Sequence, residues 1–366
     1  MRFRFITATP LDVVRGSGTY AGIATLARAL ETLGHQVAFV TPELRLPVYT
    51  AERLWFNHRL ARRQLPPCDV SVGFDMDGYR VAGREGVPHV ASIKGVIADE
   101  MRFERGPTRW SMRIQAACER KHVVRADLVM TTSRYAARRL TELYGVPGVS
   151  IVPEAIDLAG WRRLFTENPA APDPARFVVL TVCRFYPRKR LELLLAAADR
   201  LRGAIPGLEV RIVGGGPEAP RLKRIWRERG LQQTVQWMGD ISQAELARQY
   251  QACDLFCLPS VQEGFGIVFL EAMAAGKPIV AARAAAAPEV VTEGLLVEPD
   301  NDAALIEALQ RLYGNPELRA SLGAAGSRVV QQYDAPRVAR AFHAPLPKIR
   351  DSALKHHFSS APGNGV

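Results

Sequence analysis

The sequence predicts an α/β protein built from two doubly wound parallel sheets. Short apolar runs of strand length alternate with longer segments of helical length, and this alternation starts again after a proline-rich stretch near the middle of the chain. The length agrees with two domains, since 366 residues are about twice the ~150 residues of a typical domain.

The first half opens with an apolar run at residues 2–7, a loop containing Gly16 and Gly18, and a helical pattern at about 20–34. A second apolar run follows at once. Strand, glycine loop, helix and strand in this order are the opening unit of a doubly wound sheet. Strands of this half are predicted at residues 2–7, 36–40, 70–73, 87–93, 127–131 and 150–152.

Residues 164–176 form a polar stretch with three prolines, which predicts a linker and a domain boundary. The second half then repeats the alternation. Its strands are predicted at 177–183, 209–213, 235–238, 255–258, 279–281 and 295–297, and its helices at 190–203, 243–252, 268–275 and 303–313. The predicted domains are 1–168 and 169–335, followed by a terminal segment, 336–366, that either packs back on the first domain or is disordered. The tail is expected to fray from about Phe342.

Charge and cysteine content narrow the function classes. The chain carries 48 Lys and Arg against 37 Asp and Glu, a net charge of +11, which indicates a negatively charged partner. The five cysteines include no C-x-x-C pair, so neither a disulfide framework nor a zinc site is indicated. No apolar run reaches the length of a membrane span or of a signal peptide. We therefore expect a cytoplasmic protein, with association with a membrane surface left open.

The positive charge is concentrated in the first half, where residues 1–168 hold 24 basic and 17 acidic side chains. In the stretch 102–125, Arg105, Arg109 and Arg113 recur every four residues, with Trp110 among them. Two readings stay open. The stretch is either a solvated helix face or a surface for an anionic membrane or an acidic acceptor.

The segment 259–278 carries the clearest chemical pattern. A strand ends at Pro259, Gly264, Phe265 and Gly266 turn the chain, and a helix begins at about residue 267. Unpaired N–H groups at such a helix start suit a phosphate, and the glycines permit close approach. Glu263 and Glu271 flank this turn. Two carboxylates beside an anion site predict a pocket for a sugar nucleotide.

Cations follow the first strand of the second half. Arg184 and Lys189 lie just beyond that strand, where two positive charges can clamp a diphosphate. The next strand ends at a tight turn containing Gly214 and Gly215, which the same sheet edge brings close.

The ordered set of Arg184, Lys189, 213–217, Met238 with Gly239, 259–260, 263–266 and 271–273 resembles the nucleotide-binding half of the family-4 retaining glycosyltransferases of the GT-B fold. The likeness is close over 177–302 and looser over 1–153. It implies that Arg184 and Lys189 bind the diphosphate of a nucleoside-diphosphate sugar, that Glu263 contacts the transferred hexose, and that Glu271 binds the ribose. It further implies that Gly16, Gly18 and residues 264–266 lie against the donor phosphates, with Gly214, Gly215 and Met238 in the nucleotide pocket.

The sequence departs from the family pattern at Lys94, which stands where the family usually carries a histidine. Glu263 and Lys94 are the predicted catalytic residues. The expected reaction moves a hexose to an acceptor hydroxyl with retention, and it needs no metal or cofactor, because Arg184 and Lys189 can stabilise the departing diphosphate. The letters of a D-x-D motif occur at Asp75 and Asp77, which we interpret as structural or incidental.

The expected partners are a nucleotide sugar and a carbohydrate or lipid-linked acceptor, in cell-envelope or exopolysaccharide synthesis. An anionic membrane surface as a further partner is left open. Two alternatives stay open: a sugar-nucleotide 2-epimerase of the same fold, and a protein that binds nucleotide sugars without catalysis. A dehydrogenase is disfavoured, since Gly16 and Gly18 lack the third glycine of the dinucleotide fingerprint. No nucleic-acid-binding motif is present.

Overall fold

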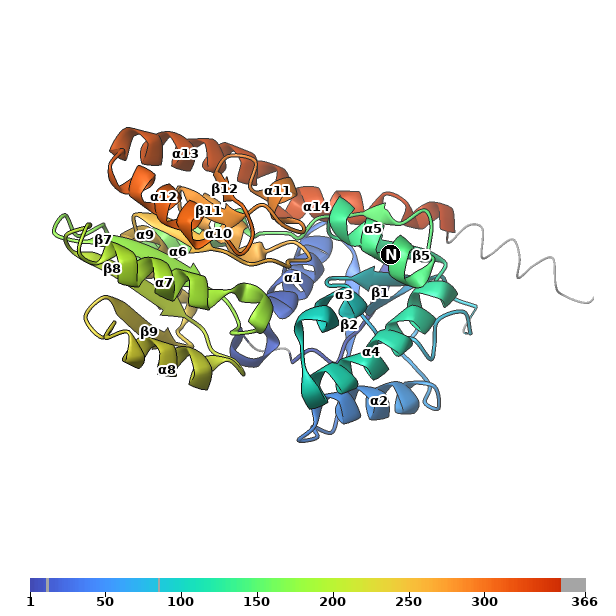
Figure 1. Ribbon diagram of the computed structural model, residues 1–366. Coiled ribbons are helices and arrows are strands. Elements are labelled where there is room, and N and C mark those ends of the chain that lie inside the picture. Colours follow the sequence, from blue (N-terminus) through green and yellow to red (C-terminus); the bar gives the residue numbers. More distant parts are fainter. Residues whose placement is uncertain (11–12, 85, 350–366) are drawn as a thin grey trace, which may run out of the picture. The chain divides into compact units, whose positions relative to one another are not determined.

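The computed structural model describes residues 1–10, 13–84 and 86–349. The chain divides into two compact units, unit 1 (Met1–Ala155 with Ala335–Val366) and unit 2 (Ile156–Asp334). Each unit contains one six-stranded parallel sheet with helices around it (Figure 1). The predicted fold class, two parallel-sheet α/β domains, is confirmed.

Unit 1 has the sheet order β2-β1-β3-β4-β5-β6, in which every neighbouring pair is parallel. Its core gathers apolar side chains from the strands and from one face of α1, such as Phe5, Ile23, Leu30 and Val72. The elements of unit 1 are β1 (Arg2–Ile6), α1 (Val13–Thr32), β2 (Gln36–Val40), α2 (Tyr49–Leu60), β3 (Val70–Phe74), β4 (His89–Ile93), α3 (Ile97–Glu100), η1 (Met101–Phe103), α4 (Gly106–Arg125), β5 (Leu128–Thr131), α5 (Arg134–Tyr144), β6 (Ser150–Ile151) and α14 (Ala335–His343).

Unit 2 has the sheet order β12-β11-β10-β7-β8-β9, again parallel throughout. Helices α7 and α8 lie side by side, as do α6 and α9 (Figure 1). The elements of unit 2 are α6 (Leu158–Glu167), β7 (Phe177–Val182), η2 (Pro187–Lys189), α7 (Leu191–Leu201), β8 (Leu208–Val213), α8 (Ala219–Glu228), β9 (Val235–Gly239), α9 (Gln243–Ala252), β10 (Leu255–Leu258), α10 (Ile267–Ala274), β11 (Ile279–Ala282), α11 (Ala287–Val290), β12 (Leu295–Val297), α12 (Asp302–Tyr313), α13 (Pro316–Val329) and η3 (Val330–Tyr333).

The predicted strands all occur, within two residues at each end, because buried parallel strands read as continuous apolar runs. The prediction of a glycine loop at residues 16–18 is wrong. Helix α1 begins at Val13 and contains both Gly16 and Gly18. The low helix propensity of glycine is overcome here by tertiary packing, since α1 buries Ile23, Leu26 and Leu30 against the sheet.

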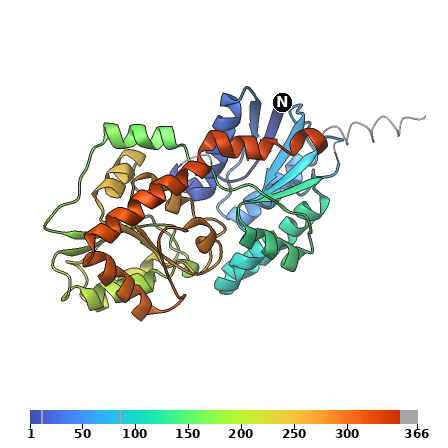
Figure 2. The same ribbon diagram turned by 90° about the horizontal axis from the view of Figure 1, so that it is seen from above.

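The division between the units also differs from the predicted boundary at 168/169. The chain passes from unit 1 to unit 2 at Ala155/Ile156, and the first residues of the predicted linker, 164–167, belong to helix α6. It returns to unit 1 at Asp334/Ala335, where α14 packs beside α1 (Figure 2).

The prediction that the tail frays from Phe342 is wrong for the described residues. Phe342 is 1% exposed and Leu346 is fully buried in the core of unit 1. These two side chains anchor the segment that follows α14. The rest of the predicted tail, residues 350–366, lies outside the described residues.

Candidate active site

The strand order of unit 2 places a ligand site at one point of its sheet. The order reverses between β10 and β7, so the loops that follow these neighbouring strands leave the sheet toward opposite faces. In open α/β sheets, ligands bind outside the carboxyl ends of the strands at such a switch point. The loop after β7 carries Arg184 and Lys189, and the loop after β10 carries Glu263.

Lys189 and Glu263 form a buried ion pair between these two loops. The distance between Lys189 Nζ and Glu263 Oε1 is 2.5 Å, and the side chains are only 12% and 9% exposed. Two hydrogen bonds to the carbonyl of Arg188 fasten the loops together: Val261 N–H donates at 2.9 Å and Ser260 Oγ at 3.1 Å. The predicted cation and the predicted carboxylate are therefore in direct contact, although they are far apart in the sequence.

Glycines after β8 hold the Arg184 loop in place. Gly214 has φ 111°, and a Cβ atom there would lie 2.2 Å from the carbonyl oxygen of Cys183, so only glycine fits. The carbonyl of Gly215 accepts the N–H of Phe185 at 2.9 Å. In turn, Gly214 N–H donates to the carbonyl of Gly239 at 2.8 Å. The predicted turn thus joins the ends of β7, β8 and β9.

Arg184 is partly exposed at this edge and lies 3.6 Å from Asp240, measured between guanidinium nitrogen and carboxylate oxygen. Asp240 was not among the predicted site residues, although it directly follows the predicted Met238 and Gly239. Met238 itself is half-buried and packs against the core. Burial raises the pKa of the Cys183 thiol to about 12, while the charges of Lys189, Glu263 and Arg184 also act on it, so these groups gather around one point.

Glu271 lies in α10, one turn beyond the predicted turn at 264–266. Burial raises the pKa of its carboxyl to about 7, and the hydroxyl of Tyr250 donates a hydrogen bond to its Oε2 at 2.8 Å, which opposes that rise. Gly266 caps α10 with φ 90°, and the buried ring of Phe265 packs edge-on against Tyr333. Nothing in the sequence pattern indicated Tyr250.

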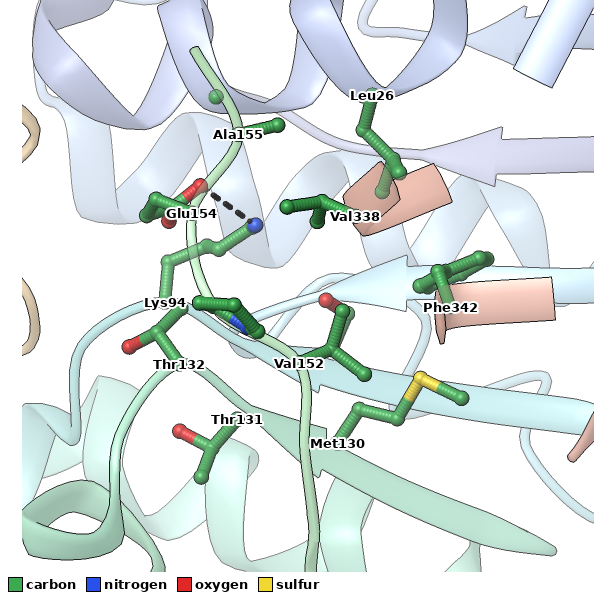
Figure 3. A pocket seen from close by; sticks show the side chains of 13 residues that line it. Leu26, Lys94, Met130, Thr131, Thr132, Val152, Glu154, Ala155, Val338 and Phe342 are labelled. Carbon is green, nitrogen blue, oxygen red and sulfur yellow. Dashed lines mark hydrogen bonds and ion pairs between the residues drawn. The ribbon is translucent and has the colours of Figure 1, made fainter. Parts of the chain in front are cut away.

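The predicted catalytic Lys94 belongs to unit 1, at the end of β4. Its Nζ lies 2.9 Å from Oε2 of Glu154, and each side chain is 8% exposed (Figure 3). A cavity of about 10 Å³, room for roughly one water molecule, lies beside the pair. Helix α1 approaches closely at Gly22, where a Cβ atom would lie 2.3 Å from the same carboxylate oxygen. The amine of Lys94 is therefore held by Glu154, a residue that the sequence reasoning missed although it follows the end of β6.

The two aspartates of the D-x-D pattern, Asp75 and Asp77, are not both available to bind a metal ion or a ligand. Asp77 is fully buried and accepts hydrogen bonds from Arg53 at 3.1 Å, from Asn57 at 3.1 Å and from the N–H of Ala8 at 2.7 Å. This contact set explains Asp77 as a structural residue. Within the described ranges, no group of three or more His, Cys, Asp or Glu side chains is arranged to hold a metal ion.

Chemically, the site in unit 2 combines a buried ammonium, a guanidinium and two carboxylates at the switch point of a parallel sheet. Cations so placed can neutralise a bound diphosphate, and carboxylates can accept hydrogen bonds from the hydroxyl groups of sugars. Gly16 and Gly18 belong to unit 1, whereas this site belongs to unit 2. The contact of these two glycines with the donor phosphates stays a prediction.

Comparison with known proteins agrees with these features. Residues 165–329 match the model of the family described as glycosyl transferases group 1, and residues 16–159 match that of glycosyltransferase family 4. In the solved structures, a sucrose-phosphate synthase from Thermosynechococcus elongatus has the same fold, with a TM-score of 0.78 and 21% identity over 98% of this chain and 100% of that one.

Two curated relatives are named as GDP-mannose-dependent α-(1-6)-phosphatidylinositol monomannoside mannosyltransferases, the second for the monoacylated form. The protein from Mycolicibacterium smegmatis is 30% identical over 262 residues, which cover 64% of this chain and 65% of the relative. The protein from Corynebacterium glutamicum is 30% identical over 263 residues, 67% of this chain and 68% of the relative. The match thus spans about two thirds of the relatives' own length. The chain belongs to the group 1 glycosyltransferases of the family 4 type, with the GT-B fold.

Proposed function

We propose that this glycosyltransferase moves a hexose-type sugar from a nucleoside-diphosphate sugar to an acceptor hydroxyl, with retention of anomeric configuration and without a metal ion. The observation that carries the proposal is the buried pair of Lys189 and Glu263 at the switch point of unit 2, with Arg184 on the same loop as Lys189. The relatives' use of GDP-mannose makes that donor the first to test.

In the proposed reaction, the acceptor oxygen forms a bond to the anomeric carbon while the bond from that carbon to the diphosphate oxygen breaks on the same face. The acceptor's proton passes to the departing diphosphate. Lys189 and Arg184 bind this diphosphate and offset its growing charge. Glu263 accepts a hydrogen bond from the hexose, and Glu271 binds the hydroxyls of the ribose.

The test is turnover of GDP-mannose, UDP-glucose and UDP-N-acetylglucosamine, each with and without phosphatidylinositol monomannoside as acceptor, in excess chelator. We expect transfer from one donor to continue in the chelator, and nuclear magnetic resonance of the product to show the donor's anomeric configuration. Activity that is lost in the chelator and restored by magnesium would contradict the metal-free proposal. A changed nucleotide sugar formed without any acceptor would favour the 2-epimerase instead.

We further propose that unit 1 attaches to anionic membranes, as an enzyme of cell-envelope or exopolysaccharide synthesis with a lipid-linked acceptor would require. Helix α4 carries the proposed surface, which we call the α4 face. Its exposed cations are Arg109, Arg113, Arg120, Lys121 and Arg125.

The α4 face has the features of an interfacial helix. None of its five cations forms an ion pair with a residue in the described part of the chain, and the one acidic residue of α4, Glu119, is buried. Trp110 is 68% exposed and Val124 is 62% exposed. Exposed basic, tryptophan and aliphatic side chains on one helix face suit the headgroup region of an anionic bilayer. None of the helices that the structure describes has the length and apolarity to cross a bilayer.

Reversing two charges of the α4 face, R109E with R113E, should weaken binding to vesicles that contain phosphatidylglycerol. Each basic residue near an anionic surface contributes about 1 kcal/mol, so the loss should reach roughly tenfold or more. Co-sedimentation with phosphatidylglycerol and phosphatidylcholine vesicles measures it. The matched control is K223E with R227E, two exposed cations of α8 in unit 2. Equal binding of both double variants would contradict the α4 face.

A further inference from the structure

A carboxylate at the end of β3 takes no part in the proposals above. The sheet of unit 1 reverses its strand order between β1 and β3, so this unit also has a switch point. Strand β3 ends at Phe74, and Asp75 is the first residue beyond it. The carboxyl end of a strand at a switch point is where open α/β sheets bind ligands.

The backbone of Asp75 is held in an uncommon conformation. Its φ is 53°, a left-handed value that costs a residue with a side chain roughly 1–2 kcal/mol. The N–H of Asp75 donates to the carbonyl of Ser92 at 3.1 Å, and its own carbonyl accepts from Nδ1 of His122 at 2.5 Å. These contacts on both sides of the residue maintain the strained turn, and such strain gathers at functional sites.

Two buried histidines, His122 and His89, hold this turn through a chain of hydrogen bonds. Because Nδ1 of His122 donates to Asp75, its Nε2 must accept, and Nε2 of His89 donates to it at 2.8 Å. Nδ1 of His89 then accepts from the hydroxyl of Ser71 at 3.2 Å. Burial lowers the pKa of His122 to about 4 and that of His89 well below its usual value, so both rings are neutral near pH 7. A Cβ atom at Gly73 would lie 2.2 Å from the carbonyl oxygen of Asp77 and 2.7 Å from the His122 ring, which explains the glycine.

One carboxylate oxygen of Asp75 is held by a backbone N–H group, and the other is free to accept a hydrogen bond from a ligand. Oδ1 accepts the N–H of Lys94 at 2.8 Å. Oδ2 has no hydrogen-bond partner among the residues that the structure describes, and Asp75 as a whole residue is partly exposed. Burial raises the pKa of Asp75 to about 6, the charge of Arg53 lowers it, and the charges of Asp77 and Glu100 raise it further.

We propose that Asp75 binds the acceptor, with Oδ2 accepting a hydrogen bond from a hydroxyl of a sugar or polyol. This assignment rests on the proposed transfer to a hydroxyl. The neighbouring polar groups have partners of their own, since Asp77 accepts from Arg53 and Asn57 and the amine of Lys94 pairs with Glu154. A carboxylate accepts and does not donate, so the group it binds is a hydroxyl rather than a phosphate.

The variant D75N separates this role from a structural one. Asparagine tolerates the left-handed conformation and still offers an oxygen to Lys94, but it places an amide donor at the position of Oδ2. The matched control is D69N, at the opposite end of the same strand, where Asp69 accepts the N–H of Arg2 at 2.7 Å. Melting temperatures of both variants check that they fold.

With GDP-mannose and phosphatidylinositol monomannoside, D75N should raise the KM for the acceptor by roughly tenfold or more, the usual effect of losing a hydrogen bond to a charged group. The KM for the donor and the hydrolysis of donor without acceptor should not change, and D69N should match the wild type. An acceptor KM within twofold of the wild type in folded D75N would contradict the proposal. So would an equal rise in both KM values.

The pH profile gives a second readout. As pH falls through about 6, Asp75 takes up a proton and loses the charge that strengthens its hydrogen bond to the acceptor hydroxyl, so kcat/KM for the acceptor at saturating donor should fall more in the wild type than in D75N. A fall of equal size in D75N would contradict the assignment. The titratable and charged groups that act on Asp75 are Tyr49 and Arg53 of α2, Asp77, Glu100 of α3, Glu119 and His122 of α4 and Tyr144 of α5.

Failure of this assignment is distinguishable from failure of the proposed function. A wild-type protein that turns over none of the three nucleotide sugars contradicts the proposed function, and the acceptor role of Asp75 with it. Turnover by the wild type with an unaltered acceptor KM in D75N contradicts the role of Asp75 alone.

Discussion

Replacing Lys189 by methionine should lower sugar transfer by about 10²–10³-fold, the usual effect of removing one group that stabilises developing negative charge. The same change should destabilise unit 2, because Glu263 would keep a buried charge without its partner. Removing one member of a buried ion pair costs about 3–5 kcal/mol of the free energy of unfolding. Turnover of GDP-mannose and urea unfolding measure the two effects.

The double variant K189M/E263Q distinguishes the effect of Lys189 on stability from its effect on sugar transfer. Neutralising Glu263 removes the unpaired charge, so the double variant should be more stable than K189M and yet remain inactive. The matched control is R190M, the next residue along the chain, whose guanidinium pairs with Asp300 at a partly exposed site. Its stability should change by no more than about 1 kcal/mol and its turnover should hold. Normal turnover in K189M would refute the assigned role of the pair.

Replacing Asp77 by alanine should be the most destabilising single change considered in unit 1, about 3–5 kcal/mol of the free energy of unfolding. Asp77 is the counter-charge of Arg53, whose side chain is 6% exposed, and the two make hydrogen bonds at 3.1 Å through both carboxylate oxygens. Burial lowers the pKa of Arg53, but the charge of Asp77 raises it above the ordinary value. Because arginine is not deprotonated in proteins, the D77A variant leaves this guanidinium buried without its partner.

Chemical denaturation of D77A measures this cost, with E43A as the control. Glu43 pairs with Arg63 at the surface, where its side chain is 71% exposed, and the loss of an exposed pair costs at most about 1 kcal/mol. A loss below about 1 kcal/mol in D77A would mean that the Arg53 network is not needed for the stability of unit 1.

The strands and the order of motifs were predictable because they depend on local pattern. Buried parallel strands are continuous apolar runs in the sequence. A glycine turn before a helix can be recognised from a few adjacent residues, as at Gly264 and Gly266. The same local reasoning failed at Gly16 and Gly18. There glycine predicts a loop, but packing of α1 against the sheet extends the helix through both residues.

The partners of the site residues were not predictable, because they come from elements far apart in the chain. Glu154 beside Lys94, Tyr250 beside Glu271 and Asp240 beside Arg184 have no spacing that relates them. Sheet order brings each pair together, and hydrophobic periodicity does not encode which strands become neighbours. The boundary predicted at 168/169 failed for the same reason, since α6 joins unit 2 through its packing on α9 and α10.

By itself, the sequence determined the α/β class and the strands of both sheets, because each follows from local composition and order. It also singled out Arg184, Lys189, Glu263 and Glu271, whose donor-binding roles stay predictions. Only the tertiary structure decided how these groups are used. It paired Lys189 with Glu263, held Lys94 on Glu154 and left Oδ2 of Asp75 open. The physical reason is that burial and the pairing of charges depend on which distant segments the parallel sheets place side by side.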